Sequence, residues 1–304
     1  MKKQITNLPA SIHARLLNKA REMNRTYSEV LQYYGMERFL YRFSCSKYRE
    51  KFILKGALLF TALQVPNRRM TLDIDFLSHY DNQVERIETV IKEICNISVE
   101  PDGLIFDSKT VRGQRIKENA NYEGVRIKFS GFLERSKIPM QIDIGFNDTI
   151  YPKVQLIDYP TILDFQKPHL YGYPIESVIS EKFEAMIILG LLNSRMKDFY
   201  DIWILIRQFD FEGLIFSIAL RKTFTKRMTA LPEKKPIFAE QIYNEYSEGQ
   251  AIWKTFLKKA NLDNAPEKLV TVAKEIEYFL IEPLTALHKG IEFNKKWIAP
   301  GPWK

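Results

Sequence analysis

The chain has 304 residues, 45% of them hydrophobic, which is enough for two modest domains that each bury a core. Its 45 Lys and Arg residues outnumber 37 Asp and Glu residues, and the formal net charge of +8 suits either a polyanionic partner or plain solubility. Two cysteines exclude a disulfide framework, and the longest strongly apolar run, Ala185 to Leu192, is too short to cross a bilayer, so we expect a cytoplasmic protein with no membrane partner.

Two helices are predicted for residues 1–50. The first begins near Pro9, a residue that suits the first turn of a helix, and the second begins at Thr26 or Ser28, both favourable N-cap residues. From Phe52 we expect a short helix and then a Pro-Asn turn. The two N-terminal helices are expected to pack on the domain that follows them.

The run TLDIDFL, Thr71 to Leu77, alternates apolar and polar residues with the period of a strand. Its three alternating apolar residues from Leu72 to Phe76 face one way, so Asp73 and Asp75 project from the other face with Cβ atoms roughly 6 to 7 Å apart. At that spacing two carboxylates can share divalent ions, and Mg²⁺ prefers such oxygen ligands. A solvated strand face is the commoner reason for an isolated Asp-x-Asp pair.

A third carboxylate follows later in the chain. Val84 to Cys95 predicts an amphipathic helix, and two alternating runs joined by a polar turn at Glu134 to Lys137 predict a β-hairpin. Asp143 lies in the second run with apolar residues around it, so it projects opposite to them as Asp73 and Asp75 do. If the two strands are neighbours, the three acids converge on a site for two Mg²⁺ ions that activate an attacking oxygen and stabilise a leaving pyrophosphate.

A glycine precedes the short helix that comes before the Asp-x-Asp strand. Gly56 would let the backbone approach a phosphate, and the N–H groups at the helix start would face a triphosphate. Lys55 and Arg69 would add positive charge. A glycine in this position is usually only a turn, so the weight of the interpretation comes from the order of the elements.

From about Pro174 the pattern is helical almost to the end of the chain. Breaks are expected at four places, Gly190 to Ser194, Gly213, Pro232 to Pro236 and Asn261 to Pro266. The predicted organisation is therefore N-terminal helices over residues 1–50, a mixed α/β domain over 51–170 and a helical domain over 171–304.

The order of these elements resembles the nucleotidyltransferase superfamily typified by DNA polymerase beta, in which a glycine followed by Gly or Ser, a helix, an Asp-x-Asp strand and a third Asp on a neighbouring strand form the site. Here Ala57 takes the second motif position, so only backbone amides can meet a phosphate there. The resemblance implies an α+β fold: a polymerase-beta-like palm, with a mixed sheet flanked by helices, and an α-helical C-terminal domain that contributes Lys182 and a Lys-Asp-x-x-Asp segment to the cleft.

A second set of motifs is similar to the AbiEii/AbiGii family of nucleotidyltransferases, the toxin halves of bacterial type IV toxin–antitoxin and phage abortive-infection systems. The similarity covers most of residues 50 to 210 and rests on K-G, R-x-T-x-D-x-D, E-K and R-x-K-D-x-x-D motifs. The matching positions are Lys55, Gly56, Arg69, Thr71, Asp73, Asp75, Glu181, Lys182, Arg195, Lys197, Asp198 and Asp201.

The resemblance implies Mg²⁺-dependent transfer of a nucleoside monophosphate from an NTP to an acceptor, with Mn²⁺ as an alternative ion. The metal ligands would be Asp73, Asp75 and Asp143. The catalytic set would add Lys182, Asp198 and Asp201. The nucleotide-binding set would be Lys55, Gly56, Ala57, Arg69, Thr71, Lys182, Arg195 and Lys197.

The charged residues from Lys182 to Asp201 also have ordinary structural interpretations. Lys182 would reach the triphosphate as a point charge, or it is a helix lysine whose ammonium group extends to water. Asp198 and Asp201 share a helix face, where they stabilise the helix start or orient Lys182, Arg195 or a bound base. Asp201 can equally form an i,i+4 pair with the lysine at position 197.

By resemblance the acceptor is the 3′ end of tRNA, or another RNA, and the protein partner is a cognate antitoxin, often a winged helix-turn-helix repressor. A basic run from Arg221 to Lys235 suits an RNA backbone, although most charge runs are solvated faces. Two alternatives remain: a small-molecule or protein nucleotidyltransferase with the same metal ligands, and a non-catalytic RNA- or protein-binding module on a decayed palm.

Overall fold

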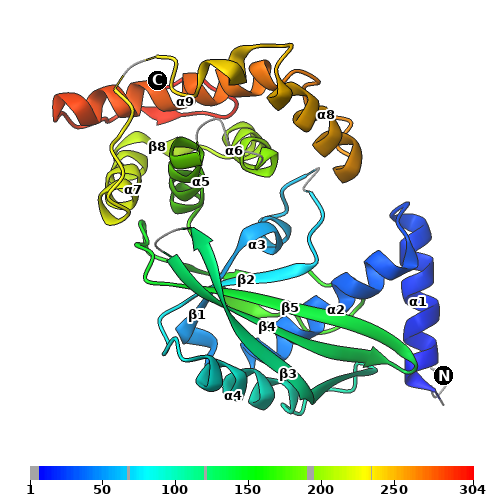
Figure 1. Cartoon of the computed structure of the whole chain (residues 1–304). Coiled ribbons are helices and arrows are strands. Elements are labelled where there is room, and N and C mark those ends of the chain that lie inside the picture. Colours follow the sequence, from blue (N-terminus) through cyan, green and yellow to red (C-terminus); the bar gives the residue numbers. More distant parts are fainter. Residues whose placement is uncertain (1–6, 67–68, 120–121, 190–194, 234) are drawn as a thin grey trace. The chain divides into compact units, whose positions relative to one another are not determined.

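The computed structural model describes residues 7–66, 69–119, 122–189, 195–233 and 235–304 (Figure 1). The chain forms two compact units. The first consists of Met1–Leu63, Thr71–Asn147 and Gln155–Gly172, and the second of Gln64–Met70, Asp148–Val154 and Tyr173–Lys304. The second unit therefore includes two short stretches, Gln64–Met70 and Asp148–Val154, that are flanked on both sides by residues of the first unit.

A mixed sheet forms the centre of the first unit, and its described part has seven strands in the order β3-β4-β5-β2-β1-β7-β6. The strands in chain order are β1 (Phe52–Lys55), β2 (Asp73–Ser78), β3 (Leu104–Asn119), β4 (Tyr122–Leu133), β5 (Ser136–Phe146), β6 (Gln155–Asp158) and β7 (His169–Gly172). The pairs β2–β5 and β1–β7 are parallel, and the remaining pairs are antiparallel. The predicted α+β fold, with a mixed sheet flanked by helices, is confirmed.

Four α-helices of the first unit are α1 (Leu8–Glu22), α2 (Tyr27–Ser44), α3 (Gly56–Ala62) and α4 (Val84–Cys95). The predicted helix starts are confirmed for α1 and α2, and Thr26 forms a capping box with Glu29 at the start of α2. Helix α2 packs on one face of the sheet, where the ring of Phe43 stacks on that of Phe76 with centroids 4.8 Å apart. Side chains on β2 that point away from Phe76 therefore lie on the opposite face of the sheet.

Two local predictions are wrong. Phe52–Lys55 is strand β1 and not the beginning of the short helix, which starts at Gly56. Strand β1 is internal to the sheet, so its apolar residues are buried on both faces and show no alternation that would distinguish a strand from a helix. Leu72, expected on the buried face, precedes β2 and is 61% exposed. Strands β3, β6 and β7 were not predicted.

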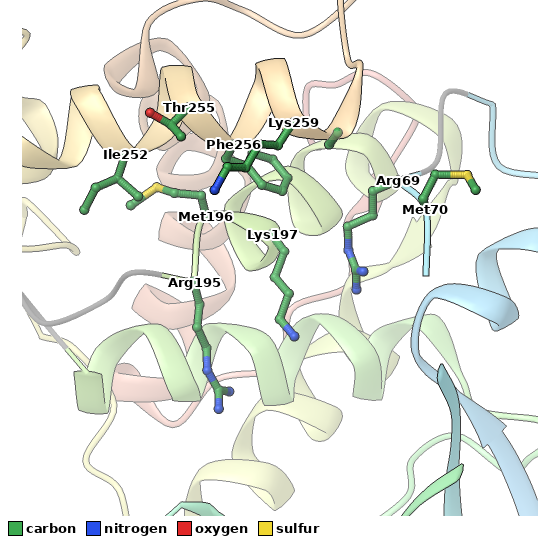
Figure 2. A pocket seen from close by; sticks show the side chains of 10 residues that line it. Arg69, Met70, Arg195, Met196, Lys197, Ile252, Thr255, Phe256 and Lys259 are labelled. Carbon is green, nitrogen blue, oxygen red and sulfur yellow. The ribbon is translucent and has the colours of Figure 1, made fainter. Parts of the chain in front are cut away.

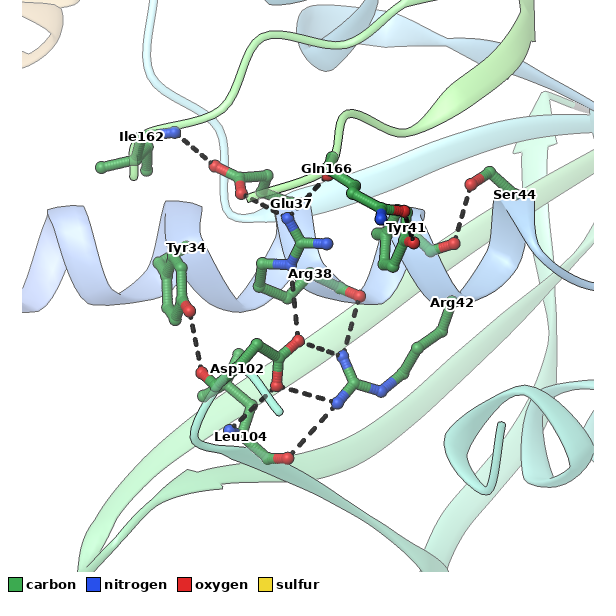
Figure 3. A network of polar contacts seen from close by, with 10 residues as sticks. All are labelled: Tyr34, Glu37, Arg38, Tyr41, Arg42, Ser44, Asp102, Leu104, Ile162 and Gln166. Carbon is green, nitrogen blue, oxygen red and sulfur yellow. Dashed lines mark hydrogen bonds and ion pairs between the residues drawn. The ribbon is translucent and has the colours of Figure 1, made fainter. Parts of the chain in front are cut away.

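A buried network of charges joins α2 to other segments of the first unit (Figure 3). Asp102, just before β3, accepts hydrogen bonds of 2.6 and 3.0 Å from Arg42, and Arg38 lies between Asp102 and Glu37. Glu37 in turn accepts a hydrogen bond of 2.7 Å from the backbone N–H of Ile162. Burial raises the pKa of Glu37 to about 7, although Arg38 and the Ile162 N–H oppose the shift.

The second unit is mainly helical, as predicted. Its α-helices are α5 (Ile175–Leu189), α6 (Met196–Gln208), α7 (Gly213–Lys226), α8 (Glu248–Ala260) and α9 (Leu269–Lys289). The break expected at Gly213 coincides with the start of α7, whereas the break expected at Gly190 to Ser194 lies outside the described residues. A short ladder of β8 (Phe211–Glu212) and β9 (Lys296–Trp297) was not predicted.

None of the helices in the described ranges is both long and apolar enough to cross a membrane.

Candidate active site

Four charged residues stand opposite one another across four neighbouring strands of the first unit. Lys55 on β1 pairs in register with Asp75 on β2, Asp75 with Asp143 on β5, and Asp143 with Arg126 on β4. Residues that pair in register project from the same face of a sheet, and adjacent strands lie only about 4.8 Å apart. The row therefore runs cation, anion, anion, cation, with two carboxylates side by side at its centre.

Asp73 adds a third carboxylate to this face. It lies two residues before Asp75 on β2, and the residues between and after them, Ile74 and Phe76, are buried on the α2 side. The structure thus brings Asp73, Asp75 and Asp143 to one face of two adjacent parallel strands. The strand period predicted that the three acids share a face, and the parallel pairing of β2 with β5 brings them together.

Gly56 fits against the carboxylate of Asp75. Its φ angle is +65°, and a Cβ atom placed there would lie 1.9 Å from the Asp75 Oδ2 atom. Both features exclude a side chain at this position. The next residue, Ala57 at the start of α3, is buried.

Thr71 shapes the entry to β2. Its backbone N–H donates to the Tyr33 hydroxyl at 3.1 Å, and its own hydroxyl accepts a hydrogen bond of 3.3 Å from the Asp73 N–H. These bonds fix the backbone just before the Asp-x-Asp strand. Thr71 therefore has a positioning contact with this strand, and the Tyr33 contact was not foreseen.

Arg126 is the main residue of this site that sequence reasoning missed. It donates to both carboxylate oxygens of Asp143, at 2.8 and 2.6 Å. This bond to Asp143 is the main cause that raises the pKa of Arg126, and the charges of Asp73 and Asp75 add to it. A guanidinium group thus lies in the field of all three carboxylates. The predicted turn at Glu134 to Lys137 would have placed Lys128 opposite Asp143, whereas the observed turn lies between Leu133 and Ser136 and brings Arg126 there.

The donor chemistry of this face suits Mg²⁺, because carboxylate oxygens are its preferred protein ligands. Within the described residues, no three His, Cys, Asp or Glu side chains already have a geometry that would hold one metal ion. Both oxygens of Asp143 are bonded to Arg126. Asp73 and Asp75 are therefore the residues that would hold a metal, and Asp143 as a metal ligand stays a prediction.

The second group of predicted residues lies in the second unit. Lys182 on α5 contacts two carboxylates of α6, Asp198 at 2.7 Å and Asp201 at 2.8 Å. Arg69 donates three hydrogen bonds of 3.2 to 3.3 Å to the same Asp201. Asp198 and Asp201 are 3% and 1% exposed, so this is a buried network with two positive and two negative side chains.

Electrostatics favours the charged forms of Lys182 and Asp201 in this network. Burial alone would lower the pKa of Lys182, but Asp198 and Asp201 outweigh it and raise that pKa. Burial alone would likewise raise the pKa of Asp201, but Arg69 and Lys182 hold it below its ordinary value. The Lys182 ammonium group thus lies between the carboxylates of Asp198 and Asp201, and its side chain is only 16% exposed. That Asp201 orients Lys182 for a reaction stays a prediction.

Arg195 and Lys197 flank this network at the start of α6. Arg195 is the N-cap residue, and Lys197 is exposed in the first turn. Together with Arg69 they line a pocket of the second unit (Figure 2). The predicted site residues therefore form two groups, one in each unit.

Glu181, next to Lys182, has a different set of partners. Its carboxylate lies 3.4 Å from Arg227 and accepts a hydrogen bond from the Tyr173 hydroxyl. Arg227 also contacts Asp148 at 3.0 Å and Glu184 at 2.9 Å, and these acids raise its pKa against the effect of burial. The basic run from Arg221 to Lys235 is thus not a uniform RNA-facing surface, because Arg227 is 10% exposed and bonded to three carboxylates.

The sequence matches the model of the AbiEii nucleotidyl transferase toxins of type IV toxin–antitoxin systems over residues 38–275. The chain belongs to this family. The matched range contains the carboxylate row of the first unit and the buried network of the second, and it confirms the resemblance found from the motifs. Membership in a toxin–antitoxin family implies an antitoxin as partner of this AbiEii chain.

Two solved structures from Helicobacter pylori are similar to the AbiEii chain. One is JHP933, with 15% sequence identity, a TM-score of 0.42, and coverage of 90% of this chain and 97% of the other. The second is named "putative nucleotidyltransferase", with 14% identity, a TM-score of 0.43, and coverage of 86% and 98%. A search among curated proteins gave no match.

Proposed function

We propose that this AbiEii-family protein transfers a nucleoside monophosphate from an NTP to an acceptor hydroxyl and releases pyrophosphate. The observation that carries the proposal is the row Lys55, Asp75, Asp143 and Arg126, with Asp73 on the same face. Carboxylates that lie side by side on neighbouring strands repel each other, so such a pair is costly in a purely structural surface. Such an arrangement is reasonable where the carboxylates have a cationic ligand to bind.

Each residue of the row has a role in this reaction. Asp73 and Asp75 would hold Mg²⁺, and Asp143 lies next to Asp75 with its orientation set by Arg126. When bound, two such ions would activate the acceptor oxygen and neutralise charge on the leaving pyrophosphate. Gly56 lets the Asp75 carboxylate lie directly against the start of α3, and Lys55 supplies positive charge in the strand beside Asp75.

The proposed acceptor is the 3′ end of tRNA, in the cytoplasm, and the proposed antitoxin is a winged helix-turn-helix repressor. The family membership and the formal charge of +8 support an RNA acceptor. In the second unit, Arg69, Arg195 and Lys197 would supply positive charge to phosphates, and Lys182 would hold Asp198 and Asp201 in place beneath them.

The test is an assay of label transfer from α-labelled NTPs with Mg²⁺. Purified wild type is incubated with total tRNA, with a small-molecule panel, or alone to detect protein labelling. Asp75→Asn removes one charge from the row, and Asp263→Asn is the matched control because Asp263 is exposed in the second unit. Circular dichroism verifies that both variants fold.

We expect labelled tRNA 3′ ends with wild type and Asp263→Asn, and none with Asp75→Asn. Transfer by Asp75→Asn at the wild-type rate would refute the catalytic role of the row. Label on a small molecule or on protein instead of tRNA would show that the acceptor is not tRNA. No transfer to any acceptor, from any of the four NTPs, would favour the decayed module.

A further inference from the structure

A pocket of about 490 Å³ opens in the second unit between three segments (Figure 2). Its walls are the residues Arg69 and Met70, the start of α6, and the last turns of α8. The α8 wall was not part of any motif recognised in the sequence. We propose that this pocket binds one nucleotide of the acceptor RNA strand, an inference that rests on the proposed function.

The charge of the pocket selects an anionic ligand. Four cationic side chains line it, namely Arg69, Arg195, Lys197 and Lys259, and none of the described residues that line it is acidic. The charge of Arg69 is balanced by the buried Asp201 behind it, so the selection of an anion depends on the other three. Cations gathered around one concave surface are the usual means by which proteins hold nucleic-acid phosphates. Lys259 comes from α8, so the positive charge surrounds the cavity from two helices and one connecting segment.

The rest of the lining is apolar and contains an aromatic ring. Met196, Ile252 and Phe256 contribute to the wall, and Figure 2 shows the Phe256 ring projecting from α8 beside Lys259. Thr255, the lining residue with a hydroxyl group, donates that hydroxyl to the Ala251 carbonyl of its own helix at 2.9 Å. A pocket with cations and a ring, but with this hydroxyl engaged elsewhere, suits recognition of phosphate and of a base face rather than of base edges.

The aromatic wall is held in position by buried contacts. Phe256 lies 5.5 Å from the Trp253 ring and 6.1 Å from the Tyr200 ring of α6, measured between centroids. Trp253 is fully buried and donates to the Pro266 carbonyl at 2.9 Å, and Gln250 is bonded to the Glu267 carbonyl at 2.8 Å. The ring therefore needs little ordering when a base binds, which favours affinity.

The chemistry of the lining favours an RNA strand over the donor NTP. An NTP reacts as its Mg²⁺ complex, which requires carboxylate ligands such as Asp73 and Asp75 of the first unit. The charged side chains that line the pocket are all cations, and these suit phosphodiesters that carry one charge each and no bound metal. Phosphates of the strand would contact Lys259 on the α8 side and Arg195 and Lys197 on the α6 side, with the base against Phe256.

The experiment measures binding without chemistry. Fluorescence anisotropy with a labelled single-stranded RNA that ends in a tRNA-like 3′ sequence is recorded in EDTA over a range of salt concentrations. Lys259→Gln removes one lining charge, and Lys258→Gln is the matched control because Lys258 is the exposed neighbour on α8 that does not line the pocket. Phe256→Leu tests the ring, with thermal unfolding as a check on the fold.

We expect Lys259→Gln to weaken RNA binding several-fold and to reduce the slope of log affinity against log salt by about 1, whereas Lys258→Gln leaves both at the wild-type value. Phe256→Leu should weaken binding by about tenfold with little change in the salt slope. Equal effects of Lys258→Gln and Lys259→Gln, or no RNA binding by wild type, would refute the proposal that this pocket binds RNA.

A second arm separates this inference from the proposed function. Calorimetric titration with Mg²⁺ and NTP is expected to show binding that Asp75→Asn impairs, while RNA affinity in EDTA is retained by that variant. If Lys259→Gln weakens NTP binding but not RNA binding, the pocket holds the donor and the inference is wrong. If wild type labels tRNA normally and Lys259→Gln binds RNA and labels it equally well, the inference fails while the proposed function stands.

Discussion

Replacing Gly56 with alanine tests the geometry of the carboxylate row most directly. The new Cβ atom would lie 1.9 Å from Asp75 Oδ2 and 2.9 Å from Asp75 Cβ. Since real Cβ contacts essentially never fall below 3.0 Å, the carboxylate has to move by more than 1 Å. A misplacement of about 1 Å in a reacting group can lower a rate by about 100-fold, and that is the loss we expect for Gly56→Ala.

Gly290 provides a matched control. It ends α9 with a φ angle of +66°, nearly the same as the +65° of Gly56, but nothing lies within 4 Å of its hypothetical Cβ atom. Alanine at either position has a left-handed backbone that costs about 1 to 2 kcal/mol. The two variants should thus lose similar stability from the backbone, while only Gly56→Ala displaces Asp75.

The assay combines urea unfolding with single-turnover transfer of labelled nucleotide. We expect Gly290→Ala to retain wild-type transfer and Gly56→Ala to lose about 100-fold, with unfolding free energies of both variants lower by about 1 to 2 kcal/mol. Transfer by Gly56→Ala within threefold of Gly290→Ala would refute the argument that the Asp75 carboxylate must occupy the space beside this glycine.

Three further predictions follow from the buried charges. Arg126→Met removes the cation that holds both oxygens of Asp143, so calorimetry should show tighter Mg²⁺ binding. Weaker binding would show that Arg126 does not compete with Mg²⁺ for Asp143. Lys182→Met leaves two buried carboxylates without this partner and should lower the unfolding free energy by about 3 to 5 kcal/mol in urea, against about 0.5 kcal/mol or less for the exposed Lys254→Met. Burial raises the pKa of Glu37 from 4.5 to about 7, so the folded protein binds more protons than the unfolded chain in that range, and the group's contribution to stability is lost as pH rises through it. Urea unfolding between pH 5 and pH 8 should show a decline of about 3 kcal/mol that is absent in Glu37→Gln, and equal slopes for the two proteins would show that Glu37 is not the cause.

The carboxylate row could largely be predicted because it depends on local periodicity. A strand period of two assigns Asp73, Asp75 and Asp143 to faces opposite their buried neighbours. The pairing of Arg126 with Asp143 could not be predicted, because it depends on the tight turn between Leu133 and Ser136, which the sequence pattern does not locate to the residue. Strand β1 could not be recognised in the same way, because a strand buried on both faces has no alternation to detect. Its position matters for the site, since it places Lys55 opposite Asp75.

The network of the second unit could be predicted only in part. Asp198 and Asp201 share a helix face by their spacing of three, but the choice between a helix-start role and a partner in space depends on what packs against that face. Arg69 reaches Asp201 across 132 residues of sequence, a separation over which no local pattern carries information. The burial of Asp201, at 1% exposure, is equally a product of tertiary packing.

The motif R-x-K-D-x-x-D therefore combines two kinds of residue in the N-cap and the first two turns of α6. Its aspartates, Asp198 and Asp201, point into the protein and hold Lys182, so their loss would act first through stability. Its basic residues, Arg195 and Lys197, lie at the helix start and line the pocket, so their loss would act first through ligand affinity. The buried aspartates thus fix the start of α6, which carries both basic residues. Under the proposed function, this coupling would explain why a motif that binds phosphate includes acidic side chains that would repel a phosphate if they were exposed.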